Sequence, residues 1–146
     1  MDFLNNTELM ENNLLTGKKI LIVEDDFSSK LYLNKILEKA NVIILNAGDG
    51  QEAVDIAFNN PDIDIILMDI QIPVIDGFEA MKKIREFREN IIIIAQTAYG
   101  LLGDKEKILS SGFNDYIIKP ILTQNLIEKL NTNLKLAATQ KRINNS

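Results

Sequence analysis

Short apolar, β-branched runs alternate along this chain with segments whose apolar residues recur every three or four positions. The runs predict buried strands at 18–23, 42–45, 63–68, 91–96 and 116–118. The helical spacing predicts helices from an Asp26 or Ser28 cap to Asn41, then over 51–59, 77–88 and 102–111, and from 123 through 134. This alternation is typical of an α/β fold with a parallel sheet, helices on both faces and right-handed crossovers.

The same spacing selects the side chains that should face the core. Those expected to face inward from the second and third helices are Ala53, Val54, Ala57 and Phe58, and Phe78, Met81, Ile84 and Phe87. The two ends should lie outside the packed unit. We expect residues 1–17 to be a linker or a short loose helix, and residues 137–146 to be a tail that frays from Thr139.

Composition excludes several classes of protein. A length of 146 residues suits one domain, and a net charge of −5 argues against a domain that grips nucleic acid. No apolar run approaches the ~18 residues that span a bilayer, and the polar start lacks a secretory signal, so we expect no membrane contact. The absence of cysteine rules out disulfides and thiolate metal sites, which fits a cytoplasmic location.

The absence of histidine is more informative about chemistry. It removes Ser-His-Asp and Cys-His catalysis and any histidine-ligated zinc. It also means that the chain cannot carry a phosphohistidine. If this protein receives a phosphoryl group from histidine, that histidine belongs to a partner.

Polar residues stand where four of the predicted strands end. Glu24 and Asp25 follow the first strand, and Asp69, Thr97 and Lys119 close the third, fourth and fifth. Carboxyl ends of parallel strands share one edge, where open α/β sheets bind ligands. Crowded carboxylates without Cys or His favour a hard cation such as Mg²⁺. A lysine and a hydroxyl beside them would stabilise phosphoryl oxygens, which leaves Asp69 as the nucleophile of an aspartyl phosphate.

Four strings in this order resemble the receiver domain of two-component response regulators. They are ILIVEDD at 20–26, LMDIQIPVIDG at 67–77, QTA at 96–98 and DYIIKP at 115–120. Separations of 44, 28 and 22 positions between Asp25, Asp69, Thr97 and Lys119 make the combination specific. The resemblance covers residues 18 to about 136 and implies a flavodoxin-like three-layer sandwich with strand order 2-1-3-4-5.

The resemblance also implies a role for each matching residue. Asp69 matches the phosphoacceptor, Glu24 and Asp25 match the acidic pair that holds Mg²⁺, and the backbone carbonyl of Gln71 completes the metal site. The remaining matches concern the phosphoryl group and its signal. They are Thr97 and Lys119 as phosphoryl contacts, Tyr116 as the aromatic switch residue, and Pro120 as the proline usually preceded by a cis peptide bond.

Two further positions flank the path of the hydrolytic water in this family. Here they are Gln71 and Tyr99, and an aromatic ring at position 99 could cover the aspartyl phosphate. We expect slower loss of the phosphoryl group than in receivers with small or acidic residues there, because attack requires a water molecule in line.

The implied function is a phosphorelay step. A partner histidine kinase or histidine phosphotransfer domain would phosphorylate Asp69, and the signal would pass through Thr97 and Tyr116 to the face made by the fourth helix, the fifth strand and the fifth helix, where a downstream protein binds. No turnover is expected beyond self-phosphorylation from a phosphodonor and autodephosphorylation.

The strings LTGKK at 15–19, AQTAY at 95–99 and GDKEK at 103–107 are most similar to receivers of hybrid sensor histidine kinases. We expect no DNA-binding output domain after the last helix, whether the chain is a stand-alone regulator or part of a larger one.

Three other kinds of protein have related sequence features. A haloacid-dehalogenase-type phosphatase needs a second Asp two residues after its nucleophile, where this chain has Gln71. A flavodoxin-like FMN carrier needs a Ser/Thr/Gly-rich phosphate loop after the first strand, where this chain has Glu24-Asp25-Asp26. A degenerate receiver that only docks proteins stays open, although it predicts the loss of a key residue and none is lost.

Overall fold

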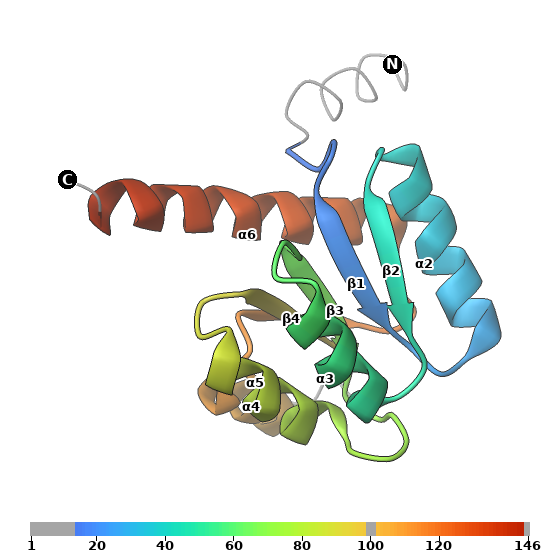
Figure 1. Cartoon of the computed structure of the whole chain (residues 1–146). Coiled ribbons are helices and arrows are strands. Elements are labelled where there is room, and N and C mark those ends of the chain that lie inside the picture. The colour runs from blue at the N-terminus through green and yellow to red at the C-terminus, as the bar shows by residue number, and fades with distance from the viewer. Residues whose placement is uncertain (1–13, 99–101, 145–146) are drawn as a thin grey trace.

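A five-stranded parallel sheet lies between two layers of helices in the computed structural model, which describes residues 14–98 and 102–144 (Figure 1). The strands are β1 (Lys19–Val23), β2 (Ile43–Ala47), β3 (Ile65–Asp69), β4 (Ile92–Thr97) and β5 (Asp115–Ile118). Their order in the sheet is β2-β1-β3-β4-β5. This confirms the predicted α/β fold and its strand order, and the strand ends differ from prediction by two residues at most.

Five helices connect and follow the strands. They are α2 (Phe27–Lys39), α3 (Gly50–Asn59), α4 (Gly77–Phe87), α5 (Leu102–Ser111) and α6 (Thr123–Asn144). Aspartates cap the first three at their N-termini, because the side chains of Asp26, Asp49 and Asp76 accept hydrogen bonds from backbone N–H groups three residues later. Each of these helices therefore starts at a defined residue just after a strand or loop at the carboxyl edge of the sheet.

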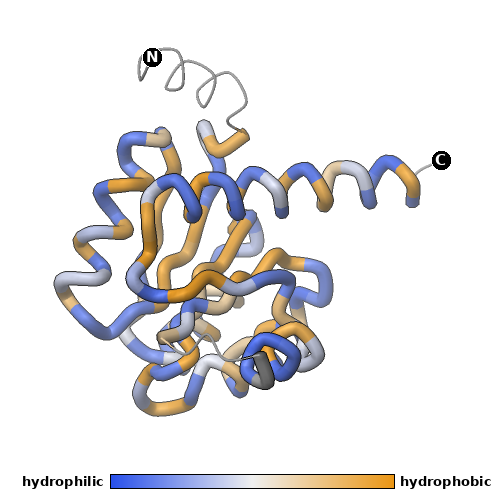
Figure 2. The backbone as a smooth tube through the Cα atoms, turned by 180° about the vertical axis from the view of Figure 1, so that it is seen from behind, coloured by the Kyte–Doolittle hydropathy of each residue, from blue (hydrophilic) through white to orange (hydrophobic). Residues whose placement is uncertain are grey.

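Alternate residues of each strand face opposite helical layers, so the sheet has a core on both sides. Even-numbered positions of β1 such as Ile20 pack with Leu37 of α2 and Leu130 of α6. Odd-numbered positions such as Leu21 pack with Ala57 of α3 and Ile84 of α4. The hydropathy colouring in Figure 2 shows the apolar strands at the centre of the molecule. The sheet is thus covered on both faces, as its apolar strands predict.

Phe58 does not face the core, contrary to prediction. Its side chain is 66% exposed and meets the ring of Phe87 edge to face, with 5.3 Å between the ring centroids. The face of α3 that touches the sheet consists of the small residues Ala53 and Ala57, which are buried. The large ring of Phe58 turns toward α4 instead, and Phe87, which was also predicted to face inward, is 36% exposed, so the two phenylalanines join α3 and α4 near the surface.

Both ends of the chain differ from prediction where the structure describes them. Leu15 is fully buried in the core beside α2 and α6, and the Leu14 N–H donates to Asn131 Oδ1 at 2.8 Å. Residues 14–17 therefore belong to the packed domain and are no linker, while residues 1–13 lie outside the described part. The segment expected to fray is helical as far as Asn144, and α6 extends past the sheet in Figure 1. Its last turns contain strong helix formers and no Gly or Pro.

Gly77 allows α4 to begin directly against the end of β3. A Cβ atom there would lie 2.5 Å from the Asp69 carbonyl oxygen and 2.8 Å from the Ile70 Cα. The Gly77 N–H also donates to the Ile70 carbonyl at 2.9 Å. Because both neighbours are backbone atoms that cannot rotate away, this close approach fixes the loop that follows Asp69.

We predict that Gly77→Ala lowers the free energy of unfolding by about 2–3 kcal/mol, because the new methyl group forces the backbone of β3 or α4 to shift. Urea unfolding monitored by circular dichroism measures the change. Gly48→Ala is the matched control, since a Cβ there meets only the Glu52 side chain at 3.9 Å, and it should change stability by less than about 1 kcal/mol. Equal stabilities for the two variants would contradict this role of Gly77.

Candidate functional site

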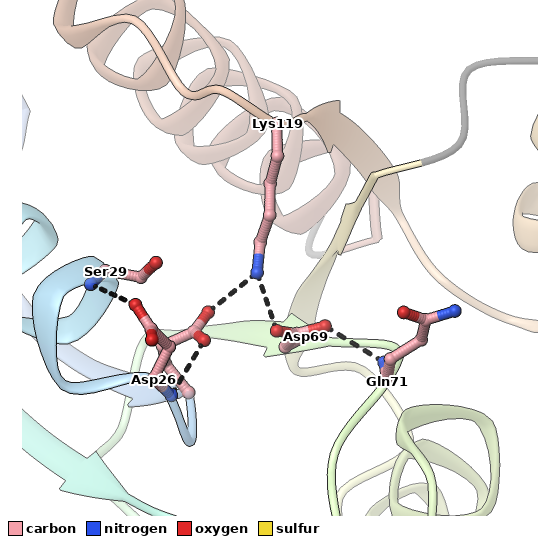
Figure 3. A network of polar contacts seen from close by, with 6 residues as sticks. Asp26, Ser29, Asp69, Gln71 and Lys119 are labelled. Atoms are coloured by element: carbon pink, nitrogen blue, oxygen red, sulfur yellow. Dashed lines mark hydrogen bonds and ion pairs between the residues drawn. The ribbon is translucent and has the colours of Figure 1, made fainter.

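The sequence-predicted site residues meet where the strands end. Glu24 follows β1, Asp69 ends β3, Thr97 ends β4 and Lys119 follows β5. Parallel pairing with aligned registers brings these four strand ends to one edge of the sheet. Figure 3 shows the Lys119 side chain reaching from β5 toward Asp69. Residues up to 95 positions apart in the sequence therefore form one cluster.

Lys119 makes ion pairs with two buried carboxylates. Its Nζ lies 2.7 Å from Asp69 Oδ2 and 3.0 Å from Glu24 Oε2. The carboxylate side chains are only 8% and 1% exposed, and the lysine side chain is 27% exposed. Water screens such pairs weakly, so the lysine charge is a main source of compensation for the two acids.

Burial and neighbouring charges shift the pKa values of Glu24 and Lys119. Burial penalises the charged form of Glu24 and raises the pKa of its carboxyl group, and the neighbouring Asp69 charge adds to this while the Lys119 hydrogen bond opposes it. Burial alone would lower the pKa of Lys119. Its contacts with Asp69 and Glu24 outweigh that penalty and raise the pKa, so the lysine stays charged at neutral pH.

Backbone N–H groups hold the outer oxygen atoms of the two acids. The Gln71 N–H donates to Asp69 Oδ1 at 2.9 Å, and the Asp26 N–H donates to Glu24 Oε1 at 3.2 Å (Figure 3). Asp26 also caps α2 by accepting from the Ser29 N–H at 2.9 Å, which confirms one of the two predicted caps. The loops after β1 and β3 thus orient the carboxylates as well as supplying them.

Three acidic residues here could hold a metal ion. Oxygen atoms of Glu24, Asp25 and Asp69 all lie within 4.8 Å of one another, and Asp25 is exposed to solvent. Three carboxylates and one lysine leave a formal charge of −2. An all-oxygen cluster with this charge and one solvent-facing ligand fits a hard divalent cation that keeps part of its water shell.

Thr97 is the last residue of β4, and Tyr116 is the second residue of the neighbouring strand β5. Thr97 is buried, and its carbonyl accepts from the Lys119 N–H at 2.8 Å. Tyr116 is half-buried, with the Nζ of Lys129 and of Lys105 at 4.5 and 5.6 Å from its ring centroid. Lys129 also pairs with Asp115 at 2.9 Å. The tyrosine ring is therefore held by cations from both α5 and α6.

Gln71 is exposed on the loop after β3, and Tyr99 lies outside the described residues. The peptide bond between Lys119 and Pro120 is cis, as the resemblance implied.

Sequence reasoning missed the position of Gln96. Its side chain is 0% exposed, and neither amide atom has a hydrogen-bond partner in the described part of the chain. The only signal in the sequence is a polar residue inside an otherwise apolar strand.

No helix within residues 14–98 and 102–144 is long and apolar enough to cross a membrane.

Comparison with known proteins matches this chain to one family. Residues 20–131 match the family of the response regulator receiver domain. The chain is 40% identical over 125 residues to hybrid signal transduction histidine kinase I of Dictyostelium discoideum, an alignment covering 80% of this chain and 7% of that protein. It is 34% identical over 119 residues to the polar-differentiation response regulator DivK of Brucella ovis, covering 80% and 96%. The chain thus spans a small part of the kinase and nearly all of the regulator.

Solved structures agree in fold. The Ssk1 receiver domain, crystallised with the histidine phosphotransfer protein Ypd1 of Saccharomyces cerevisiae, is 36% identical with a TM-score of 0.74, covering 80% of this chain and 88% of that one. A chain of the CheX–CheY–BeF3–Mg complex from Borrelia burgdorferi is 30% identical with a TM-score of 0.77, covering 82% and 90%.

Proposed function

This chain belongs to the response regulator receiver domain family of two-component systems, and on that premise we propose that it accepts a phosphoryl group on Asp69 from a phosphohistidine of a partner. The observation that carries the proposal is the Asp69 carboxylate at a strand end, 2.7 Å from the Lys119 ammonium group and grouped with Glu24 and Asp25. A nucleophile, a fixed positive charge and a candidate metal site are the parts that phosphoryl transfer requires.

The transfer is an in-line displacement at phosphorus. A carboxylate oxygen of Asp69 forms the new O–P bond while the N–P bond to the histidine breaks, and the imidazole nitrogen keeps that electron pair and takes up a proton from water. Lys119 and the Thr97 hydroxyl stabilise the phosphoryl oxygens. Glu24, Asp25, Asp69 and the Gln71 carbonyl would hold Mg²⁺, which supplies further positive charge when bound. By its match to the family, Gln71 would flank the path of the water that later hydrolyses the product; the second matching position, Tyr99, lies outside the described residues.

The donor in this proposal is a histidine kinase or a histidine phosphotransfer domain. The chain has no histidine of its own. A similar receiver has been crystallised with a histidine phosphotransfer protein, and a similar sequence occurs in a hybrid histidine kinase. Both findings support this class of partner.

The output surface in this proposal is the face formed by α5, β5 and α6. Tyr116 lies on β5 between cations of α5 and α6 and is the switch residue that would respond to the phosphoryl group through Thr97. Phosphorylation would shift the balance between two existing arrangements of this face, which a downstream protein reads.

Incubation with acetyl phosphate and Mg²⁺ should add one phosphoryl group to the wild-type chain and none to Asp69→Asn, because the amide is no nucleophile. Intact-mass spectrometry measures the addition, and hydroxylamine should remove it. Asp76→Asn is the matched control, since it changes the nearby cap of α4 to another good capping residue and should label like wild type. Equal labelling of Asp69→Asn would overturn the assignment.

Mg²⁺ should raise the melting temperature, because it relieves the repulsion among three neighbouring carboxylates. At about 100 times the Kd the gain is about 2.7 kcal/mol, or roughly 5–10 °C for a domain of this size. Differential scanning calorimetry with and without Mg²⁺ tests this. Asp25→Ala should lose the response, whereas Glu86→Ala, an exposed acid on α4, should keep it. A full response in Asp25→Ala would place the ion elsewhere.

Beryllofluoride with Mg²⁺ should move backbone amide resonances of α5, β5 and α6 as well as those of the acidic cluster, because the phosphoryl mimic shifts the whole face. Two-dimensional ¹H–¹⁵N NMR of wild type and Asp69→Asn measures this, with β2 as the unaffected reference. Shifts confined to the acidic cluster would exclude the proposed output face.

A further inference from the structure

The loop between β3 and α4 holds a valine in a strained backbone conformation. Val74 has a φ of 72°, in the left-handed region that β-branched residues rarely adopt. A proline followed by a positive φ is the arrangement of a type II turn, whose third position favours Gly or Asn. The other non-glycine residue with positive φ within residues 14–98 and 102–144 is Asn41, a type that tolerates this region. Valine is therefore an unfavourable residue for the backbone at position 74.

The neighbours of Val74 impose this conformation. The Gly50 N–H at the start of α3 donates to the Pro73 carbonyl at 3.3 Å, and a Cβ atom on Gly50 would clash with the Ile75 carbonyl oxygen. Asp76 then caps α4. Because the residues on both sides of Val74 are held against the two helices, the loop cannot relax around the valine.

Val74 contributes little packing in return for this strain. Its side chain is 75% exposed, which makes it the most exposed large apolar side chain of the described residues. Neither apolar core of the described chain includes it. Ile72 is buried and Ile75 packs against the core, so other residues anchor the loop. Backbone strain that no burial offsets is typical of positions that serve binding or catalysis.

The place of Val74 in the fold points to the protein that donates the phosphoryl group. The loop begins directly after Asp69, and its Gln71 N–H holds the Asp69 carboxylate (Figure 3). The Asp69 side chain is only 8% exposed, so a phosphohistidine reaches it only when the donor protein covers this edge of the sheet. The proposed output face consists of α5, β5 and α6, so a downstream protein bound there leaves the loop between β3 and α4 free.

Two other loops place exposed apolar side chains at the same edge of the sheet. Phe27 begins α2 after the acidic pair and is 70% exposed, and Leu122 precedes α6 and is 60% exposed. With Val74, these side chains give the edge around the charged cluster an apolar rim. Burial of exposed apolar area favours association, so this rim suits a protein partner better than a small phosphodonor.

We propose that Val74 is a specificity-determining contact for a histidine phosphotransfer protein that docks over Asp69. This inference rests on the proposed function and adds to it a residue that acts on the donor protein alone. The strained loop presents the valine to an apolar surface of that protein, and Lys119 and the acidic cluster act on the phosphoryl group itself. Val74 therefore controls the rate of transfer from a protein donor and has no part in phosphorylation by a small molecule.

The histidine phosphotransfer protein Ypd1, phosphorylated on histidine with phosphoramidate, is the donor that tests this. Val74→Asn should slow transfer from Ypd1 by about 5- to 10-fold, because the buried valine contact is lost. The same variant should raise the melting temperature by about 3–6 °C, because asparagine tolerates the positive φ. Labelling by acetyl phosphate should keep its wild-type rate. Rapid-quench kinetics and differential scanning calorimetry measure these changes.

Two variants serve as controls. Val74→Ile keeps an apolar, β-branched side chain and should accept the phosphoryl group like wild type. Leu136→Asn makes the same kind of change as Val74→Asn at a residue of α6 that is 63% exposed and far along the helix, and it should leave transfer from Ypd1 unchanged.

Equal rates of transfer from Ypd1 to wild type and to Val74→Asn overturn this inference, and so does the absence of transfer from Ypd1 to wild type. A lower melting temperature of Val74→Asn also overturns it, because the valine would then be a packing residue. A wild-type chain that acetyl phosphate does not label rejects the proposed function instead, so the two failures are distinguishable.

Discussion

One ammonium group placed between two buried carboxylates is the interaction on which this edge of the molecule depends. Glu24 and Asp69 come from neighbouring strands and would repel each other at close range in a water-poor setting. Lys119 contacts both, at 3.0 and 2.7 Å. Removing one partner from such a group leaves an uncompensated buried charge, which costs far more than the net value of the intact pairs. The strand order is what allows the contact, because it places β1 beside β3 and brings the end of β5 within reach of both.

The loops around these charges are fixed by backbone contacts. Asp26 and Asp76 end the loops after β1 and β3 by capping the helices that follow. Because Gly77 has no side chain, α4 approaches the backbone of β3 more closely than any other residue type at this position would allow. The carboxylates are therefore presented by short, determined turns, which suits a site that must position an attacking oxygen and a cation together.

Much of this arrangement could be predicted because it follows from local patterns and chain order. Alternating strands and helices predict a parallel sheet, and strand ends of a parallel sheet meet at one edge, which brings Asp69 and Lys119 together. What could not be predicted depends on neighbours distant in the sequence. Phe58 packs against the ring of Phe87 on another helix, and the burial of Leu15 depends on α2 and α6. The Gln96 amide has no hydrogen-bond partner among the described residues because of what surrounds it in space, which no pattern within β4 reveals.

The length of α6 has a mechanical consequence. The helix is continuous from Thr123 through the core contacts at Leu126 and Leu130 to Asn144, a length of 22 residues or roughly 33 Å. A helix also fixes rotation: each residue turns the chain by about 100° and advances it by about 1.5 Å. Any segment joined in helical continuity would inherit both an angle and a distance from the receiver core. Inserting one residue would rotate such a segment by about 100° about the helix axis but move it along the axis by only about 1.5 Å.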